Sequence, residues 1–141
     1  MKYWVFDLDG TLVDSLTTHF DILKKVFDHF GAEFTKDNHQ EVLKITAKTL
    51  PKYLESKLGA ESAGPAHDMF QSLNNEAFRE IKAFDGIENL LRSLKLNDRQ
   101  LAVWTARDLD ATVKILNHTG LNAYFSICIS GSCTDEGKPH P

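Results

Sequence analysis

The sequence has few cysteines, no long apolar run and no excess of positive charge, and each shortage excludes a class of protein. Its two cysteines, Cys128 and Cys133, do not form a disulfide framework, and only His140 lies near them as a further zinc ligand. No apolar run approaches the ~20 residues that span a bilayer. Asp7 and Asp9 interrupt the N-terminal apolar run, which rules out a signal-like core. We expect ordinary reduced thiols, a cytoplasmic location and no membrane contact.

Charge and composition exclude a nucleic-acid partner and favour one ordinary domain. The formal net charge is −4, and the basic residues are scattered rather than clustered. A chain of 141 residues with 42% hydrophobic residues can fill a core.

An all-helical block follows the first apolar run. Apolar residues at spacings of three and four predict a helix over residues 16–30, which Gly31 ends. Further helices are predicted over 36–49 and from Pro51 to Leu58. Residues 59–65 are predicted as a loop, and a long helix follows them as far as Phe84.

Strands and helices alternate in the rest of the chain. A compact helix is predicted over 87–94, a buried strand over 101–104, a helix over 108–118 and a third strand over 124–129. The simplest architecture is an α/β fold with a Rossmann-type parallel sheet and a helical insert after the first strand. Residues 1–14 and 84–141 form its core, and residues 15–83 form a helical cap.

Two carboxylates directly follow the first predicted strand, in the sequence Asp7-Leu8-Asp9-Gly10-Thr11. The continuous apolar run before them suits a strand that is covered on both faces. Side chains two residues apart point the same way, so Asp7 and Asp9 project together at the carboxyl end of the strand, where open α/β sheets bind ligands. An oxygen-only cluster of this kind favours Mg²⁺. The alternative interpretation is a plain surface turn, since Asp and Gly are turn residues.

Polar residues suited to a phosphoryl group follow three successive strands. Asp7 and Asp9 follow the first, Thr105 the second and Lys138 the third. One carboxylate can attack phosphorus, and a second carboxyl can protonate the leaving alcohol and then activate water. A hydroxyl and backbone N–H groups can hold phosphate oxygens, and an ammonium group can offset the accumulated negative charge.

These residues carry a family resemblance that covers the whole chain. Residues 7–15, DLDGTLVDS, are similar to the first signature of the haloacid dehalogenase (HAD) superfamily of phosphohydrolases. Thr105 matches its second signature and Lys138 its third. The helical insert resembles the small cap of the phosphoglycolate-phosphatase and β-phosphoglucomutase branch.

The resemblance implies a role for each matching residue. Asp7 is the nucleophile, Asp9 the general acid/base, and Lys138 orients Asp7 and the phosphate. Mg²⁺ is held by the Asp7 carboxylate and the Asp9 backbone carbonyl. The implied phosphate-binding groups are Thr105, the backbone N–H of Ala106, Gly10 and Thr11.

Four further polar residues have a possible structural role, and two of them also have a possible functional one. His19 falls where β-phosphoglucomutase-like members carry a histidine near the acid/base, but it equally suits a solvated helix surface. Arg107 can reach substrate anions or form a salt bridge with aspartates at the start of the next helix. Asp14 and Ser15 suit helix capping, which we prefer for both.

The sequence departs from the family in one respect. The family's fourth signature, acidic residues after another strand that complete the Mg²⁺ site, has no match, and Asp135 and Glu136 stand in the wrong order to replace it. In the family that strand pairs beside the first, so we expect an open apolar sheet edge. Three explanations compete: a fragment, a relative that binds phosphate without turnover, and a dimer or strand complementation by a second chain.

The leading functional hypothesis is a Mg²⁺-dependent phosphatase that acts on a small phosphorylated metabolite through an aspartyl phosphate on Asp7. The main alternative is an inactive or truncated HAD-like module that binds phosphate or regulates. A sugar-phosphate mutase is a further alternative. A receiver-type phospho-acceptor domain is disfavoured, because such a domain needs short alternating βα units where this chain has a helical block.

Overall fold

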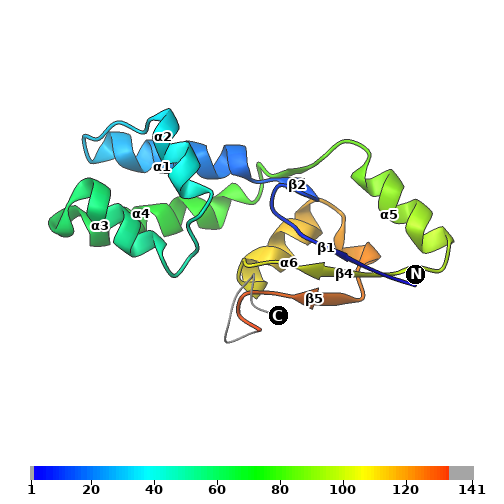
Figure 1. Cartoon of the computed structure of the whole chain (residues 1–141). Helices are drawn as coiled ribbons and strands as arrows, with labels where there is room; N and C mark the ends of the chain where they lie inside the picture. The colour runs from blue at the N-terminus through cyan, green and yellow to red at the C-terminus, as the bar shows by residue number, and fades with distance from the viewer. Residues whose placement is uncertain (1, 134–141) are drawn as a thin grey trace. The chain divides into compact units, whose positions relative to one another are not determined.

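A computed structural model describes residues 2–133, which fall into two compact units. The first unit contains the residues up to Leu16 and those from Phe78 onward, and the second contains Thr17–Ala77 (Figure 1). The chain thus leaves the first unit after two strands and returns to it after a helical insert. No helix within residues 2–133 is long and apolar enough to cross a membrane.

The first unit is an α/β sheet with its helices in the connections. Its elements are β1 (Tyr3–Phe6), β2 (Val13–Asp14), β3 (Lys82–Ala83), α5 (Ile87–Leu96), β4 (Gln100–Trp104), α6 (Leu109–His118), the 3₁₀ turn η1 (Asn122–Tyr124) and β5 (Ile127–Ile129). The three longer strands are parallel in the order β1-β4-β5, and β2 pairs with β3 antiparallel. The predicted α/β fold with a parallel sheet and a helical insert is confirmed.

The parallel register brings the ends of the three strands to one edge of the sheet. Phe6 of β1 pairs with Val103 of β4, and Val103 pairs with Cys128 of β5. The residues that follow β1, β4 and β5 therefore leave the sheet together, at the edge where parallel sheets place ligands.

One face of this sheet packs against both helices. Leu101 and Val103 of β4 lie in one buried cluster with Leu91 of α5 and with Ile115 and Leu116 of α6. Each of these side chains is at most 1% exposed. Burial at this face holds β4, and with it the loop that follows β4, in place.

The opposite face is open within the described part of the chain, which corrects the prediction of a strand covered on both faces. Tyr3 and Val5 of β1 are 68% and 62% exposed, and Ile127 of β5 is 56% exposed. These residues alternate with those that face the helices, because successive side chains on a strand point to opposite faces. Since α5 and α6 both contribute to the first cluster, neither covers this face.

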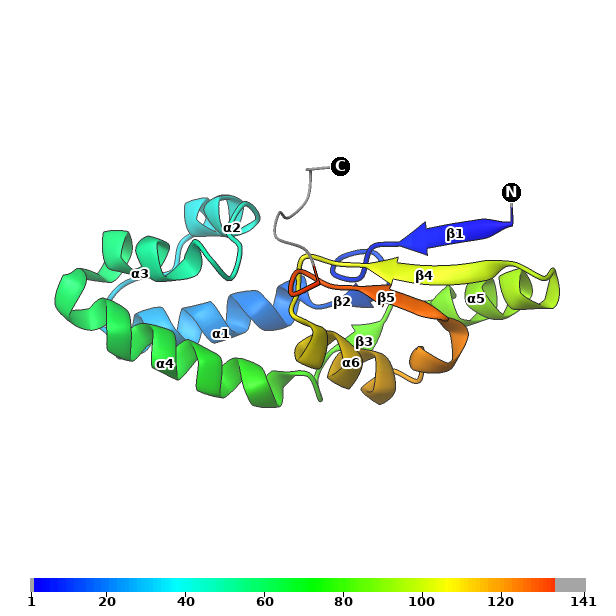
Figure 2. The ribbon, with the colours of Figure 1, turned by 90° about the horizontal axis from the view of Figure 1, so that it is seen from below.

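The second unit is a helical bundle with its own core (Figure 2). Its helices are α1 (Leu16–His29), α2 (Lys36–Val42), α3 (Leu50–Leu58) and α4 (Ala60–Ala77). The buried cluster draws on all four helices: Ile22, Leu23, Val26, Phe27, Val42, Leu50, Leu54, Ala66, Phe70 and Ala77. The apolar stripe predicted for residues 16–30 is confirmed as the buried side of α1.

Two predicted boundaries in this unit are wrong. Residues 59–65 are not a loop, because Gly59, with φ +86°, ends α3 and α4 begins at Ala60. The strong helix propensity of alanine outweighs the turn propensity of the neighbouring residues in this segment. The long helix ends at Ala77 instead of Phe84, and Ile81 packs into the α/β core.

Two shorter elements also differ from the prediction. The helix expected over 36–49 ends at Val42, after which the N–H groups of Lys44 and Ile45 bond three residues back and tighten the turn. The third strand begins at Ile127, because residues 122–124 form η1.

Candidate active site

The loop after β1 is anchored by its own backbone. The N–H groups of Thr11, Leu12 and Val13 all donate to the carbonyl of Leu8, at 3.3, 2.9 and 3.1 Å. Gly10 makes the reversal with φ +73°, a value that glycine adopts without strain. The Leu8 and Leu12 side chains are fully buried, which fixes the loop. Asp7, on the other side of Leu8, is half-buried.

The loop after β4 carries a buried threonine and an arginine. Thr105 is 2% exposed and donates its N–H to the carbonyl of Ile129, at 2.9 Å. The Arg107 N–H in turn donates to the Thr105 hydroxyl oxygen at 3.1 Å. Asp108 ends the loop by capping α6, since its side chain accepts from the Ala111 N–H at 2.9 Å.

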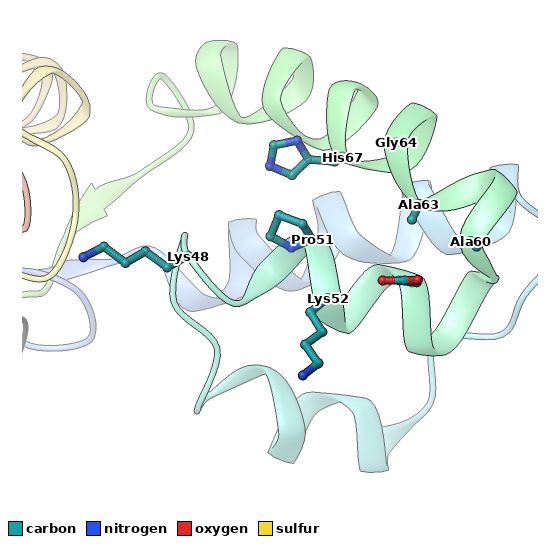
Figure 3. A pocket seen from close by; sticks show the side chains of 8 residues that line it. Lys48, Pro51, Lys52, Ala60, Ala63, Gly64 and His67 are labelled. Carbon is teal, nitrogen blue, oxygen red and sulfur yellow. The ribbon is translucent and has the colours of Figure 1, made fainter.

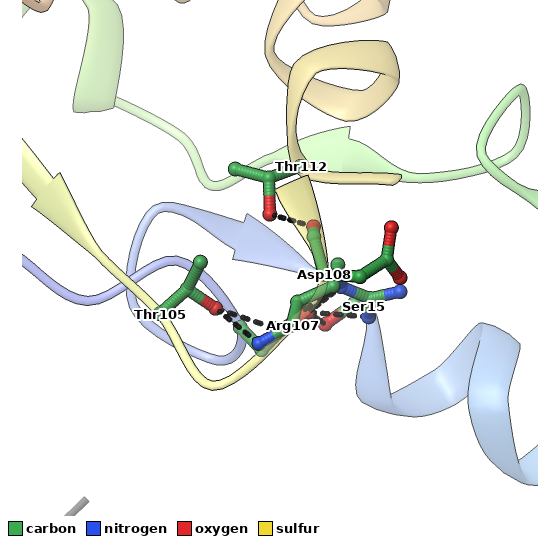
Figure 4. A network of polar contacts seen from close by, with 6 residues as sticks. Ser15, Thr105, Arg107, Asp108 and Thr112 are labelled. Carbon is green, nitrogen blue, oxygen red and sulfur yellow. Dashed lines mark hydrogen bonds and ion pairs between the residues drawn. The ribbon is translucent and has the colours of Figure 1, made fainter. Parts of the chain in front are cut away.

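The two loops meet at the carboxylate of Asp9. Arg107 Nη2 lies 2.6 Å from Asp9 Oδ1, and Arg107 Nε lies 3.2 Å from both oxygens. The Ser15 hydroxyl donates to Oδ1 at 2.6 Å, and the Thr105 hydroxyl lies 3.5 Å from Oδ2. Figure 4 shows the Ser15, Thr105 and Arg107 side chains gathered in this network.

This network determines the charge state of Asp9. Burial raises the pKa of the Asp9 carboxyl, but the Arg107 charge and the hydrogen bonds from Arg107, Ser15 and Thr105 outweigh it. The pKa of Asp9 therefore lies below its ordinary value, and the group is a carboxylate that accepts hydrogen bonds.

The structure places Gly10, Thr11 and Ala106 of the predicted site at the same sheet edge, in the loops after β1 and β4. The Thr11 hydroxyl lies 3.5 Å from Oδ2 of Asp7. Gly10 forms the turn between them and the β2 strand, and Ala106 is exposed beside Thr105.

The structure does not test two of the predicted site residues. His19 belongs to the helical unit, where its ring meets that of Phe70 edge to face, with centroids 5.3 Å apart. Lys138 lies outside the described residues. Their roles stay predictions.

The sequence did not predict that Ser15 and Arg107 contact Asp9. Ser15 was predicted to cap a helix, and the structure adds that its hydroxyl donates to Asp9. Arg107 pairs with Asp9 and not with the aspartates at the start of α6, where Asp110 pairs with Lys114 at 2.7 Å. Neither contact follows a sequence pattern, because each depends on how a loop folds back on Asp9.

The donor set suits Mg²⁺ in kind. Asp7 offers a carboxylate and Asp9 a backbone carbonyl, both hard oxygen ligands. Mg²⁺ usually binds one or two carboxylates and completes its shell with waters and substrate phosphate. Within residues 2–133 there is no group of three or more His, Cys, Asp or Glu side chains that could hold a metal.

The helical unit contains an open pocket of about 600 Å³ between α3 and α4. It is lined by Lys48, Pro51, Lys52, Glu55, Ala60, Ala63, Gly64 and His67. Figure 3 shows that the side chains of Lys48 and Lys52 extend in different directions.

Known proteins resemble this chain over its full length. It is 24% identical over 143 residues to a phosphorylated carbohydrates phosphatase of Thermotoga maritima and 28% identical over 151 residues to a phosphoglycolate phosphatase of Aquifex aeolicus. The crystal structure of a predicted phosphoglycolate phosphatase from Haemophilus somnus superimposes with a TM-score of 0.85 at 24% identity, covering 100% of this chain and 67% of that one. That last likeness shows the shared fold.

The matches cover all of this chain but only part of each relative. Both curated phosphatases align with 100% of this chain, which spans 66% of the length of each. Residues 4–141 match the family described as haloacid dehalogenase-like hydrolase. The acidic loop, the threonine after β4 and the helical insert together agree with this match, and the chain belongs to the haloacid dehalogenase-like hydrolase family.

Proposed function

We propose that the site hydrolyses a phosphate monoester through a covalent aspartyl phosphate. In the first step an Asp7 oxygen attacks phosphorus and the bond from phosphorus to the ester oxygen breaks. Asp9, which must first part from Arg107 and take a proton from solvent, gives that proton to the leaving alcohol. In the second step Asp9 takes a proton from water, the water oxygen attacks phosphorus, and the bond to Asp7 breaks to release inorganic phosphate.

Other groups of the chain hold the phosphate during both steps. Thr105 lies at the edge that Asp7 and Asp9 share, and its hydroxyl and the Ala106 N–H are suited to bind phosphate oxygens. Gly10 and Thr11 are exposed in the loop that follows Asp7, and the Thr11 hydroxyl lies 3.5 Å from Oδ2 of Asp7. From the family resemblance we assign Lys138 to the same cluster of charges.

A bound Mg²⁺, held by the Asp7 carboxylate and the Asp9 carbonyl, would offset negative charge on the phosphoryl group. We propose that the helical unit acts as a cap that selects the substrate, with residues 15–83 as the cap and 1–14 with 84–141 as the core. The names of the relatives, which include phosphorylated carbohydrates and phosphoglycolate, support a small phosphorylated metabolite as substrate.

One observation carries this proposal. The loops after β1 and β4, which are 98 residues apart in the chain, meet through the pair of Asp9 and Arg107. An ordinary surface turn, the alternative interpretation, does not require a buried threonine or a guanidinium paired with its carboxylate. A site assembled from two strand ends can hold a nucleophile and phosphate-binding groups in fixed positions, as phosphoryl transfer requires.

The test is hydrolysis of p-nitrophenyl phosphate by the 141-residue chain in Mg²⁺, with an EDTA control and the variant Asp7→Asn. Hydrolysis that disappears in both controls supports the proposal. Equal turnover by Asp7→Asn would show that Asp7 is not the nucleophile. A chain that is folded by circular dichroism and binds orthophosphate without turnover would be the binding module of the alternative hypothesis.

A further inference from the structure

The two cysteines of the chain lie on one face of the sheet. Cys128 belongs to β5 and packs against the buried cluster on the side of α5 and α6. Side chains two residues apart on an extended chain share a face, so the fully buried Ser130 points to the same side. The Ser130 hydroxyl lies 3.1 Å from Sγ of Cys133. The Cys133 sulfur is therefore near the end of β5, on the face that carries Cys128.

A tight turn brings Cys133 back to this position. The Cys133 N–H donates to the Ser130 carbonyl at 3.0 Å, so residues 130–133 reverse the direction of the chain after β5. Both cysteines are free thiols; Cys128 is half-buried and Cys133 is exposed. Burial raises the pKa of the Cys128 thiol, and the charge of Cys133 raises it further, which means that the two thiols lie close enough to interact.

The two thiols differ in reactivity. Hydrogen bonds from the Ser130 hydroxyl and backbone lower the pKa of Cys133. The Leu109 N–H donates to Ser132 Oγ at 3.0 Å, and Ser132 Oγ lies 3.3 Å from Ser130 Oγ, which leaves the Ser130 hydrogen for the Cys133 sulfur. An exposed thiolate is the species that attacks a disulfide. Cys128, which is less accessible and harder to ionise, is suited to react second.

The turn that carries Cys133 also holds the loop after β4. The Gly131 N–H donates to the Arg107 carbonyl at 2.8 Å, and the Ser132 hydroxyl accepts from the Leu109 N–H. A disulfide needs Cα atoms within about 7 Å and sulfur atoms in direct contact. Cys133 must therefore leave Ser130 and move back along β5, and this movement opens the turn and breaks both contacts.

We propose that Cys128 and Cys133 form a reversible disulfide by exchange with a small-molecule disulfide of the glutathione class, and that this bond draws the loop after β5 away from the loop after β4. The disulfide and the loop movement are independent of the proposed function. An effect on turnover rests on that function, because the loop that loses its support carries Thr105 and Ala106, the residues proposed to bind phosphate.

The exchange takes two steps. The Cys133 thiolate attacks one sulfur of the small disulfide, whose S–S bond breaks and releases a thiolate that takes up a proton. Cys128 then loses its proton to solvent, attacks the Cys133 sulfur and releases the second small thiol. Two protein thiols are thereby oxidised to one disulfide, and one small disulfide is reduced to two thiols.

The test exposes the reduced 141-residue chain to oxidised glutathione without denaturant. The readouts are intact mass, hydrogen exchange of backbone amides followed by NMR, and hydrolysis of p-nitrophenyl phosphate in Mg²⁺. The matched variants are Cys128→Ser and Cys133→Ser, each of which keeps a hydroxyl where the thiol was. Dithiothreitol added to the oxidised chain tests reversal.

We expect the wild-type chain to lose the mass of two hydrogen atoms. Cys128→Ser retains one bound glutathione, because no second thiol displaces it, and Cys133→Ser stays unmodified. In the oxidised wild type the Gly131 and Leu109 amides exchange at least about tenfold faster, since each loses the protection of a hydrogen bond. Hydrolysis falls by at least about tenfold, because the phosphate-binding groups lose their fixed position. Dithiothreitol restores both rates.

Four results would overturn the inference. The wild-type chain could stay unmodified, keep a bound glutathione, or form a disulfide between two copies. Cys133→Ser could take up glutathione as fast as Cys128→Ser. The oxidised chain could keep the amide exchange rates of the reduced chain. Unchanged hydrolysis in a fully oxidised chain would contradict the effect on turnover.

Failure of the proposed function gives a different result. A chain without hydrolysis in either redox state would contradict that function, while mass and amide exchange would still decide the disulfide and the loop movement. Circular dichroism checks the fold of each variant. Should either variant unfold, the mass and exchange rates of the wild-type chain decide.

Discussion

Gly131 lies against the carbonyl oxygen of Ala106 so closely that no Cβ atom fits between them. The Gly131 N–H also donates to the Arg107 carbonyl at 2.8 Å, which holds the loop after β5 against the loop after β4. We therefore expect Gly131→Ala to push the two loops apart and to lower the free energy of unfolding by about 1–3 kcal/mol, as overpacking does. Urea denaturation followed by circular dichroism measures this loss.

A matched control for this substitution is Cys133→Ala, two residues further along the same loop. The Cys133 side chain is exposed, so we expect a change within about 0.5 kcal/mol. Equal stability of the Gly131→Ala chain and wild type would show that the loop can move away from Ala106 without loss.

The stability of the chain should depend on the charge of Asp9. Because its pKa is lowered in the folded chain, the ionised group stabilises the fold above its ordinary pKa of about 3.9, and this contribution disappears as the pH falls through the lower folded value. The difference in unfolding free energy between wild type and Asp9→Asn should therefore shrink as the pH is lowered from 6 to 3. Denaturation in metal-free buffer measures it, and a difference independent of pH would contradict the prediction.

An exposed proline inside α4 should limit the stability of the helical unit. Pro65 lies in the second turn of the helix, where it has no N–H to donate and its ring crowds the preceding turn. We expect Pro65→Ala to raise the free energy of unfolding by about 1–3 kcal/mol, measured by urea denaturation. The control is Pro51→Ala in the first turn of α3, where proline is tolerated and no gain is expected. Equal gains at both positions would refute this explanation.

The two faces of the sheet should respond differently to the same substitution. Val103 is fully buried, so Val103→Thr places a hydroxyl in the core and should cost about 1–3 kcal/mol of unfolding free energy. Val5 is 62% exposed, and Val5→Thr should change stability by less than about 0.5 kcal/mol. Thermal and urea denaturation measure both. A large loss for Val5→Thr would mean that another polypeptide covers this face in solution.

The sequence was most informative where structure follows from periodicity. Asp7 and Thr105 could be assigned to one edge because parallel strands end together, whatever the loops between them do. Arg107 and Ser15 could not be assigned, because the position of each side chain depends on a loop held by contacts to Leu8 or Gly131. These backbone contacts have no sequence signature, and they decide which donor reaches Asp9.

Helix boundaries, too, could not be predicted where they depend on a single residue. The apolar stripe of α1 was readable because it covers several turns, whereas the start of α4 depends on one backbone angle at Gly59. A single glycine is compatible with a loop and with a sharp corner between two helices, and only the packing of α3 against α4 selects the corner.

The short antiparallel pair of β2 and β3 has a consequence for how this chain can vary. Val13 pairs with Ala83 and Asp14 with Lys82, so the chain leaves and re-enters the sheet unit through two adjacent segments, as a hairpin does. The residues between them take the place of a hairpin loop, and each doubling of loop length adds only about 0.6 kcal/mol of closure entropy. The helical insert can therefore be exchanged, lengthened or shortened with little loss of stability in the sheet unit.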